Sequence, residues 1–420
     1  MGFATSYLEE RALFPQRITE APDTETGIIV VVPAYNETGI VNMLDSLARC
    51  RAPQCKVEVI VVVNAPASAS RGIVDTNIRC IEDIESWKCT NKSSFFRLFI
   101  FDTGSHSYSG WGVGMARKTG MDEALRRFDQ LARPDGVILN LDADCRVKEN
   151  YLTAVENDFL RRKERSACSI YFEHPVAGEE FQQSQYSAIT LYELHLRFYY
   201  QGLIYSGFPD VFHTVGSAIA VKALPYVKAG GMNRKQAGED FYFIQKLIPQ
   251  GGYIALNSTT VYPSPRSSGR VPFGTGATMG KMESDPGAHL MTYNVEAFNE
   301  LRYLTELTGK LYNASSSDLE EIFNSLPPGL KMFTGEDEWI GKTAEIRKNT
   351  ATYSSFSKRF FSWFNMFRVV KYMNFVHDRI FEKQPVEVSA MKLLAMKGMS
   401  HSPADALSLL MHYRLLERQD

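Results

Sequence analysis

Short apolar runs separated by stretches of helical periodicity recur through the first half of the chain. The runs at 27–32, 57–63, 95–101 and 137–141 are short and contain many β-branched or aromatic residues, which is typical of buried strands. After the first run, the apolar residues between 41 and 48 fall on one face of a helix. Strands that alternate with helices at this spacing predict an α/β fold, with a mostly parallel sheet and helices on both faces.

Two carboxylates follow the fourth run, in the segment Asp142-Ala143-Asp144. Side chains two residues apart on a strand share a face, so Asp142 and Asp144 point the same way if the strand geometry persists to the end of the run. Paired carboxylates suit Mg²⁺ or Mn²⁺, with waters and substrate phosphates completing the shell. The alternative is a solvated strand end with two turn-forming acids, and the tripeptide alone favours that alternative.

Polar residues also follow the first two strands, as Asn36-Glu37 and Asn64. In parallel sheets, ligands bind outside the carboxyl ends of the strands. Because three such ends carry polar residues, a site for a metal and a diphosphate becomes the preferred interpretation of Asp142 and Asp144.

A second acidic pair, Glu239-Asp240, begins a predicted helix with an apolar stripe at 243, 244, 247 and 248. Asp240 falls on the inward side of that stripe, where a carboxylate is costly unless it is paired or takes part in chemistry. Capping of the helix is the structural alternative for Glu239.

Two further segments carry candidate binding residues. The Gly- and Pro-rich loop at 262–287 contains Arg266 and Arg270, which could hold a diphosphate or an anionic acceptor or simply be solvated. The aromatic-rich stretch at 184–206 could line an acceptor groove or touch a membrane surface, and the preferred alternative is a core helix.

Composition narrows the class of protein. A chain of 420 residues is too long for one ordinary core, and a net charge of −2 gives no field that favours nucleic acid, so no nucleic-acid partner is expected. The longest apolar run is far shorter than the about 18 residues of a membrane span, and no signal-peptide pattern follows the charged first residues. The six cysteines form no C-x-x-C pair and are expected to be free thiols. We therefore expect a cytoplasmic protein, with peripheral contact at the inner face of the membrane as an open option.

Taken in order, these segments resemble a family 2 glycosyltransferase with the GT-A fold, a Rossmann-like sheet flanked by helices. The resemblance covers residues 27–250, a little over half of the chain. Its elements are the opening strand and nucleotide-binding loop (30–37), the second strand (61–64), the segment that passes the donor nucleotide (112–120), the DxD motif (142–144), the acceptor-side strand and turn (215–220 and 229–231) and the Glu-Asp pair (239–240).

The resemblance implies sugar transfer from a nucleotide-diphosphate sugar, a UDP-sugar by preference, to an acceptor hydroxyl. The acceptor could be a saccharide, a lipid-linked molecule or a small molecule. Asp142 and Asp144 would bind Mg²⁺ or Mn²⁺, and Asp240, beside Glu239, would be the general base of an inverting transfer. With the two loop arginines included, the expected nucleotide-sugar-binding residues are Pro33, Ala34, Tyr35, Glu37, Asn64, Gly112, Arg117, Asp142, Arg266 and Arg270.

The chain departs from the family pattern at two positions. Asn64 stands where the family usually has an Asp that contacts the base. Relatives often supply a further metal ligand, commonly His, after the Glu-Asp pair, whereas the first histidine there is His289. Either His289 reaches the ion, or water completes its shell, or the arginines share the diphosphate charge; water together with arginine is preferred.

The resemblance also predicts the domain organisation. We expect an N-terminal extension at 1–26, a glycosyltransferase domain at 27–265, a Gly/Pro-rich active-site loop at 266–295 and a helical C-terminal subdomain at 296–420. The glycosyltransferase domain divides into a nucleotide-sugar half (27–145) and an acceptor half (146–265).

Two other functions are open from the sequence. A nucleotidyltransferase also places paired acids and a metal on such a sheet, but that class has a Gly-rich, Arg-bearing loop after the first strand, where this chain has Pro-Ala-Tyr-Asn-Glu. A non-catalytic protein that binds sugar nucleotides is the other alternative, and the presence of all three aspartates disfavours it.

Overall fold

The structure is a computed structural model that describes residues 2–92, 95–104, 111–235, 238–267, 274–285, 289–399 and 405–419. The chain divides into two compact units. Unit 1 comprises Met1–Gln182 and Phe212–Gly280, and unit 2 comprises Gln183–Val211 and Lys281–Asp420.

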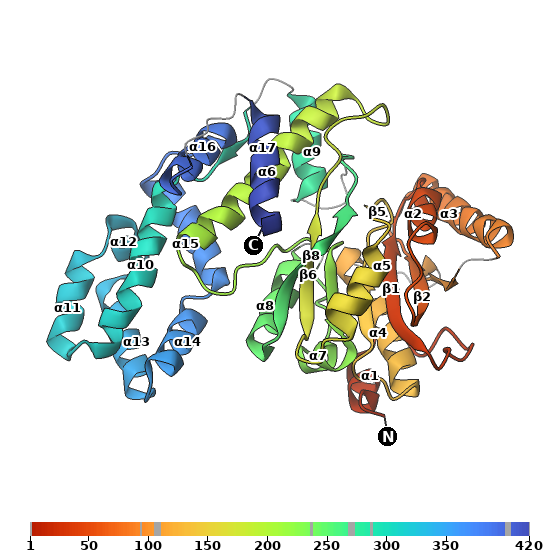
Figure 1. Cartoon of the computed structure of the whole chain (residues 1–420), viewed down its shortest axis with the longest axis horizontal. Helices are drawn as coiled ribbons and strands as arrows, with labels where there is room; N and C mark the ends of the chain where they lie inside the picture. Colours follow the sequence, from red (N-terminus) through yellow and green to blue (C-terminus); the bar gives the residue numbers. More distant parts are fainter. Residues whose placement is uncertain are drawn as a thin grey trace. The chain divides into compact units, whose positions relative to one another are not determined.

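Unit 1 is built on an eight-stranded sheet with the order β3-β2-β1-β4-β7-β6-β8-β5 (Figure 1). The strands are β1 (Thr26–Ala34), β2 (Lys56–Val63), β3 (Phe96–Asp102), β4 (Val137–Asn140), β5 (Arg146–Val147), β6 (Ala167–Phe172), β7 (Ile219–Lys222) and β8 (Tyr253–Tyr262). Strands β1 to β4 are parallel, and β6 is parallel to β8. Strand β7 runs antiparallel to both of its neighbours, and β5 runs antiparallel to β8.

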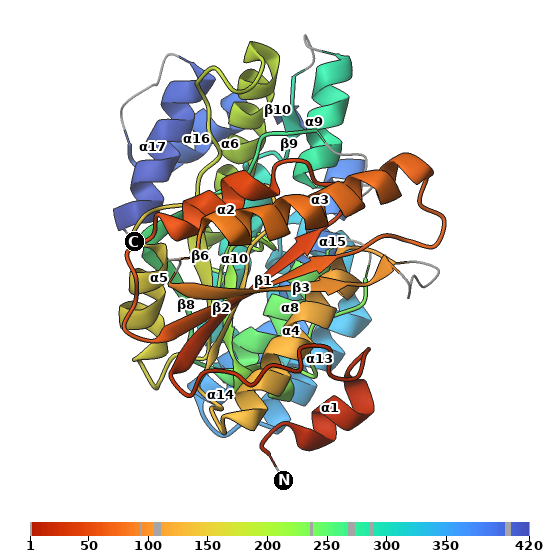
Figure 2. The same cartoon turned by 90° about the vertical axis from the view of Figure 1, so that its right-hand side faces the viewer.

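Helices cover both faces of the first four strands. Helices α2 (Ile40–Ala48) and α3 (Arg71–Thr90) lie on one face and α4 (Val113–Gln130) on the other, as Figure 2 shows. The β-branched residues of β1 and β2 are buried, and those on the α4 side share one apolar cluster with the helix. Helix α4 lies close to β1 because Gly120 has no side chain: a Cβ there would stand 2.4 Å from Cγ1 of Val31.

The predicted α/β fold class is confirmed: unit 1 is a mostly parallel sheet flanked by helices, and the chain carries a helical C-terminal part. Two details of the prediction were wrong. The acceptor-side strand expected at 215–220 starts only at Ile219, because a turn closed by the Ala218 amide on the Val215 carbonyl precedes it. Strand β4 ends at Asn140, so Asp142 and Asp144 lie in the following turn, which the Cys145 amide closes on the Asp142 carbonyl.

The winding of the sheet reverses between β1 and β4. The chain passes outward from β1 through β2 to β3 and then returns to add β4 on the other side of β1. Such a reversal opens the sheet at the carboxyl ends of the two middle strands, which is where ligands bind in folds of this kind. Glu37 follows β1, and Asp142 and Asp144 follow β4.

The first 26 residues, expected as an extension, are part of unit 1. Helix α1 (Thr5–Arg11) buries Tyr7 and Leu8 in the cluster on the α4 side of the sheet, together with Ile18. The remaining helical segments assigned wholly to unit 1 are α5 (Tyr151–Ala154) with its π-helical continuation Val155–Leu160, α7 (Ala223–Lys228), α8 (Glu239–Leu247) and the 3-10 turn Ile248–Gln250. Helix α9 (Thr275–Ser284) lies within the predicted loop at 266–295 and crosses the division between the units.

Unit 2 is helical. Its helices are α6 (Gln183–Tyr205), α10 (Glu296–Asn313), α11 (Ser316–Ser325), α12 (Pro328–Thr334), α13 (Glu336–Lys348), α14 (Tyr353–Trp363), α15 (Met366–Arg379), α16 (Val386–Met396) and α17 (Ala406–Gln419), and β9 (Met291–Thr292) pairs with β10 (Gln384–Pro385). Helix α6, predicted within the glycosyltransferase domain, belongs to this unit instead.

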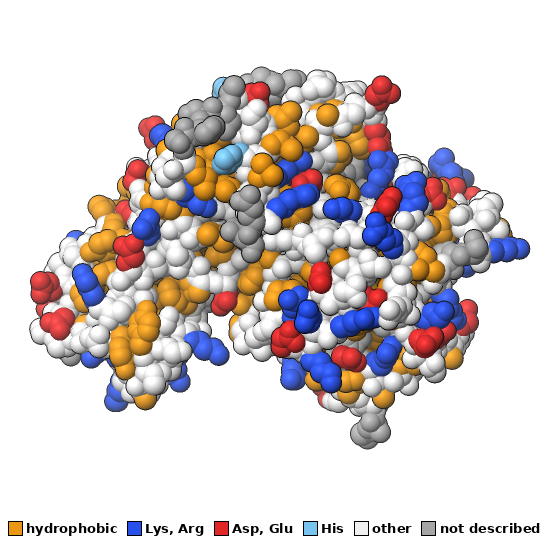
Figure 3. Space-filling view, viewed as in Figure 1, with side chains coloured by type: hydrophobic (Ala, Val, Ile, Leu, Met, Phe, Trp, Pro, Cys, Tyr) orange, Lys and Arg blue, Asp and Glu red, His pale blue; other side chains and the backbone are white. Residues whose placement is uncertain are grey.

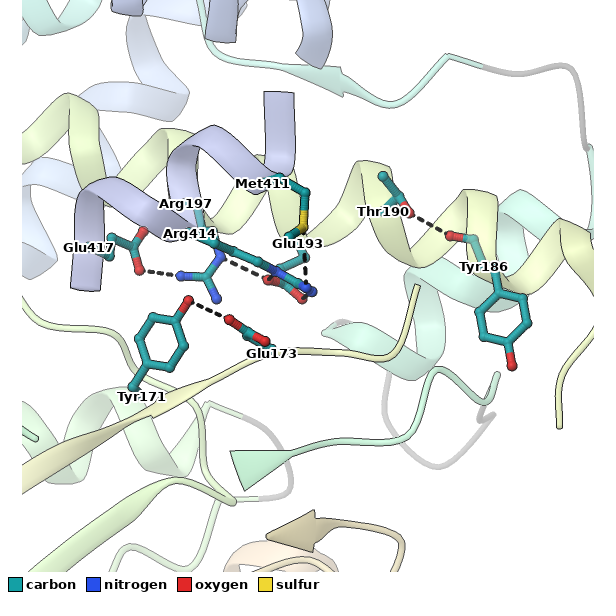
Figure 4. Close-up of polar contacts among 9 residues, drawn as sticks. All are labelled: Tyr171, Glu173, Tyr186, Thr190, Glu193, Arg197, Met411, Arg414 and Glu417. Atoms are coloured by element: carbon teal, nitrogen blue, oxygen red, sulfur yellow. Dashed lines mark hydrogen bonds and ion pairs between the residues drawn. The ribbon is translucent and has the colours of Figure 1, made fainter. Parts of the chain in front are cut away.

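Four buried charged side chains form ion pairs that link α17, the last helix of unit 2, to α6 (Figure 4). Arg414 donates to both carboxylate oxygens of Glu193, at 2.7 and 2.8 Å, and Arg197 pairs with Glu193 and with Glu417. All four side chains are at most 7% exposed. These pairings explain how charged residues are accommodated in the aromatic-rich α6, which is a core helix of unit 2.

None of the helices in the described ranges has the length and apolarity that crossing a bilayer requires. Basic and acidic side chains are interspersed over the face shown in Figure 3.

Candidate functional site

Two chains of alternating acids and arginines lie at the carboxyl ends of β1 and β4. The first runs from Glu37 through Arg266 to Asp144, and the second runs from Asp142 through Arg117 to Glu239. All of these residues belong to unit 1. The sheet reversal therefore brings together side chains that are up to 229 residues apart in the sequence.

In the first chain, the Arg266 guanidinium group donates to both carboxylate oxygens of Glu37. Nη1 donates to Oε1 at 3.1 Å and Nη2 to Oε2 at 2.5 Å, and Nη2 also donates to Oδ2 of Asp144 at 3.0 Å. The side chain of Glu37 is 1% exposed, that of Asp144 27% and that of Arg266 31%. Arg266 thus covers a buried acid on one side and reaches a partly exposed one on the other.

In the second chain, a buried guanidinium joins the DxD segment to the second acidic pair. Arg117 lies on α4, donates from Nη2 to Oδ1 of Asp142 at 2.6 Å and pairs through Nη1 with Oε1 of Glu239. The Arg117 side chain is 5% exposed. Gly216 makes room for it, because a Cβ there would stand 2.4 Å from Nη1 of Arg117.

Asp240 follows Glu239 in the first turn of α8, which begins after Gly238. Gly238 adopts φ +70°, a left-handed conformation that glycine reaches without strain. Oδ1 of Asp240 accepts a hydrogen bond from the Phe241 amide at 2.7 Å, and the side chain is half-buried. Asp240 is thus held in place by the helix start.

Burial makes the carboxyl groups of Glu239, Asp240 and Asp144 stronger bases than solvated ones by raising their pKa. It raises the pKa of Glu239 to about 7 against the opposing Arg117 charge, and it raises the pKa of Asp240 against the same charge. Desolvation, followed by the Asp142 charge, raises the pKa of Asp144, and Arg266 opposes the rise. A carboxylate with a raised pKa can accept a proton from a hydroxyl more readily, which is the property a general base needs.

The two chains carry more acids than arginines. Together with Asp240, the two chains contain five carboxyl groups and two arginines, Arg117 and Arg266, so these seven side chains carry three excess negative charges when all are ionised. A group of this kind attracts a cation and repels an anion that arrives without one.

The donor atoms of Asp142 and Asp144 fit a hard divalent cation. Each carboxylate has one oxygen, Oδ2 of Asp142 and Oδ1 of Asp144, that accepts no hydrogen bond from a described residue. Mg²⁺ and Mn²⁺ are commonly held by one or two carboxylates, with waters and phosphate oxygens completing the shell. Within the described ranges, no group of three or more His, Cys, Asp or Glu side chains is placed to hold a metal.

Asn64 is engaged inside unit 1. Its Nδ2 donates to the carbonyls of Ala34 at 2.8 Å and Val62 at 3.2 Å, and its Oδ1 accepts from Nε1 of Trp111 at 2.9 Å. The side chain is 3% exposed, so the amide fastens the end of β2 to β1. Asn77 completes this support by donating to the Asn64 carbonyl and accepting from the Asn36 amide, and neither it nor Trp111 carries a sequence pattern that singles it out.

The other predicted site residues are distributed as follows. Pro33 and Ala34 are buried at the end of β1, Tyr35 is half-buried beyond it, and Gly112 precedes α4 and accepts hydrogen bonds from its first turn. His289 is exposed and lies in unit 2, and Arg270 lies outside the described residues.

No protein-family model matches the chain, and no curated protein matches its sequence. Among solved structures, S. aureus TarS 1-349 in complex with UDP-GlcNAc aligns over 93% of this chain and 91% of that one, with 16% identity and a TM-score of 0.39. The mannosyltransferase PcManGT from Pyrobaculum calidifontis, in complex with GDP-Man and Mn²⁺, aligns over 99% of this chain and 92% of that one, with 14% identity and a TM-score of 0.37.

Proposed function

We propose that this chain is a family 2-like glycosyltransferase that moves a sugar from a nucleotide-diphosphate sugar, UDP-sugars first, to an acceptor hydroxyl. The observation that carries the proposal is the pair of acid–arginine chains at the β1/β4 reversal. They bring an excess of carboxylates and two guanidinium groups to the carboxyl ends of the middle strands, where nucleotides bind in such folds.

The excess of negative charge supports a cation requirement. A sugar nucleotide is itself an anion, so its diphosphate is repelled by these carboxylates unless a cation accompanies it. Asp142 and Asp144 would hold that cation through the oxygens that their arginines leave open. When bound, a divalent cation supplies Lewis-acid stabilisation of the charge that develops on the departing diphosphate.

Asp240 takes the role of general base. Its carboxylate, fixed by the Phe241 amide and made more basic by burial, accepts the proton of the acceptor hydroxyl as that oxygen attacks the anomeric carbon. One base acting on one direct attack gives inversion at that carbon. Glu239 is committed to Arg117 and orients the start of the same helix.

A donor screen tests this function. The melting temperature of the protein is measured with UDP-, GDP- and dTDP-sugars, each with and without Mn²⁺ or Mg²⁺. At least one donor is expected to raise it in the presence of the ion, by the amount that mass action gives for a bound ligand. A donor that binds but is never consumed in the presence of acceptor mixtures would favour a binding protein, and no shift with any donor would contradict the proposal.

A further inference from the structure

Arg266 makes two contacts that differ in their surroundings. The first is the pair of hydrogen bonds from its guanidinium group to the Glu37 carboxylate. That carboxylate is 1% exposed and also accepts from the Gly39 amide at 2.7 Å. The contact of Arg266 with Asp144 uses Nη2 alone, at 3.0 Å, and Asp144 is 27% exposed. Loss of the first contact would remove two charge-assisted hydrogen bonds from a carboxylate that water does not reach, whereas loss of the second would remove one from a carboxylate that is partly solvated. The second contact is therefore the one that Arg266 can give up.

We propose that the Arg266 guanidinium competes with a divalent ion for Asp144 and leaves this carboxylate when a donor binds. In the nucleotide-free protein it occupies Oδ2 of Asp144 and competes with a divalent ion for that carboxylate. When the ion and a donor arrive together, Arg266 keeps its hydrogen bonds to Glu37 and turns Nη2 from Asp144 to an oxygen of the diphosphate. The inference rests on the proposed function, and it assigns to Arg266 the regulation of that site.

The chemistry of the guanidinium group suits both states. It is always protonated, and its N–H groups bind carboxylate and phosphate oxygens alike. While Nη2 donates to Oδ2 of Asp144, its positive charge lies beside the carboxylate that would hold a divalent ion, and the two cations would repel each other. A diphosphate that draws Nη2 away therefore favours the ion, and by reciprocity the ion favours the diphosphate.

The test is a manganese titration without nucleotide, in which the signal of free Mn²⁺ is followed by electron paramagnetic resonance. R266Q is expected to bind Mn²⁺ about tenfold more tightly than wild type, because it lacks the competing charge. R146Q is the matched control. Arg146 stands two residues after Asp144, but its side chain is 44% exposed and pairs with Glu180, so its loss removes the same charge without freeing Asp144. Manganese affinity in R266Q that equals that of R146Q, or no binding in either, overturns the proposal.

The double variant E37Q/R266Q separates two causes of tighter binding and removes the buried carboxylate that loses its guanidinium partner in R266Q. If Asp144 is the freed ligand, the double variant also binds Mn²⁺ more tightly than wild type. If its affinity returns to the wild-type value, the extra ligand in R266Q was Glu37, and the proposal is overturned.

The affinity for UDP is expected to change in the opposite direction from the affinity for Mn²⁺. With Mn²⁺ saturating, R266Q is expected to bind UDP about tenfold more weakly than wild type, since it lacks one charged donor to the diphosphate. Unchanged or tighter UDP binding overturns the assignment of Arg266 to the diphosphate. Failure of the proposed function would give a different result, because wild type would then bind no nucleoside diphosphate at all. The manganese comparison needs no nucleotide, so it still decides whether Arg266 competes with the ion for Asp144.

Discussion

Replacing Asp240 by asparagine is expected to lower the rate of sugar transfer about 1,000-fold while nucleotide-sugar binding stays near the wild-type value. Asparagine has the same shape, and its Oδ1 can still accept from the Phe241 amide, so the start of α8 is preserved. It cannot take a proton from the acceptor hydroxyl at neutral pH. Initial rates and calorimetric donor binding, measured on the same preparations, separate the loss of chemistry from the loss of binding.

Asp75→Asn is the matched control for this substitution. Asp75 is 51% exposed and pairs with Arg71 on the surface of α3. Because such surface pairs contribute little to stability, its change to asparagine is expected to leave the rate within about twofold of wild type. Transfer by Asp240→Asn at more than about a tenth of the wild-type rate would show that another group takes the proton. Glu239→Gln then identifies whether the neighbouring acid is that group.

The second large effect is expected on stability, from Arg117→Gln. Arg117 is buried and compensates Asp142 and Glu239, so its removal leaves Glu239, which is 3% exposed, without its cation. Removing one partner of a buried ion pair costs roughly 3–5 kcal/mol of unfolding free energy. Since that is a large share of the stability of an ordinary domain, urea unfolding should show a clearly lowered midpoint.

Two further variants define the cause of this loss. Arg71→Gln removes an arginine that is 95% exposed, and it is expected to change the unfolding free energy by less than about 0.5 kcal/mol. Arg117→Gln combined with Glu239→Gln leaves no buried charge at Glu239, and it should recover more than half of the loss. If Arg117→Gln alone costs less than about 1 kcal/mol, the Arg117 bridge does not stabilise unit 1 as described.

The strands of the sheet could be predicted closely because their signal is local. Strands β1, β2 and β4 are short apolar runs, and their observed bounds differ from the predicted ones by at most two residues at either end. The antiparallel direction of β7 could not be predicted, since apolar periodicity is the same in both directions. Helix α9 escaped notice because its sequence, with two glycines and two threonines in ten residues, has low helix propensity.

The sequence marked several residues that the structure brings together, but not the partners that join them. The strand ends marked Glu37, Asp142 and Asp144, and the apolar stripe of α8 marked Asp240. The sequence could not indicate that Arg117 lies between Asp142 and Glu239, because Arg117 and Glu239 are 122 residues apart. It also could not indicate that Arg266 lies between Glu37 and Asp144. Asn64 illustrates the same limit, because the carbonyl of Ala34 and the indole of Trp111 that engage it lie 30 and 47 residues away.

We propose that Asp142 and Asp144 hold a divalent ion together with the diphosphate of a sugar nucleotide. A calorimetric titration with UDP, repeated with Mn²⁺ and with a chelator, on wild type and Asp144→Ala, tests it most directly. We expect wild type to bind UDP with Mn²⁺ at least about tenfold more tightly than without it, and Asp144→Ala to lose this difference. Equal binding with and without the ion, or a manganese effect that survives in Asp144→Ala, would contradict it.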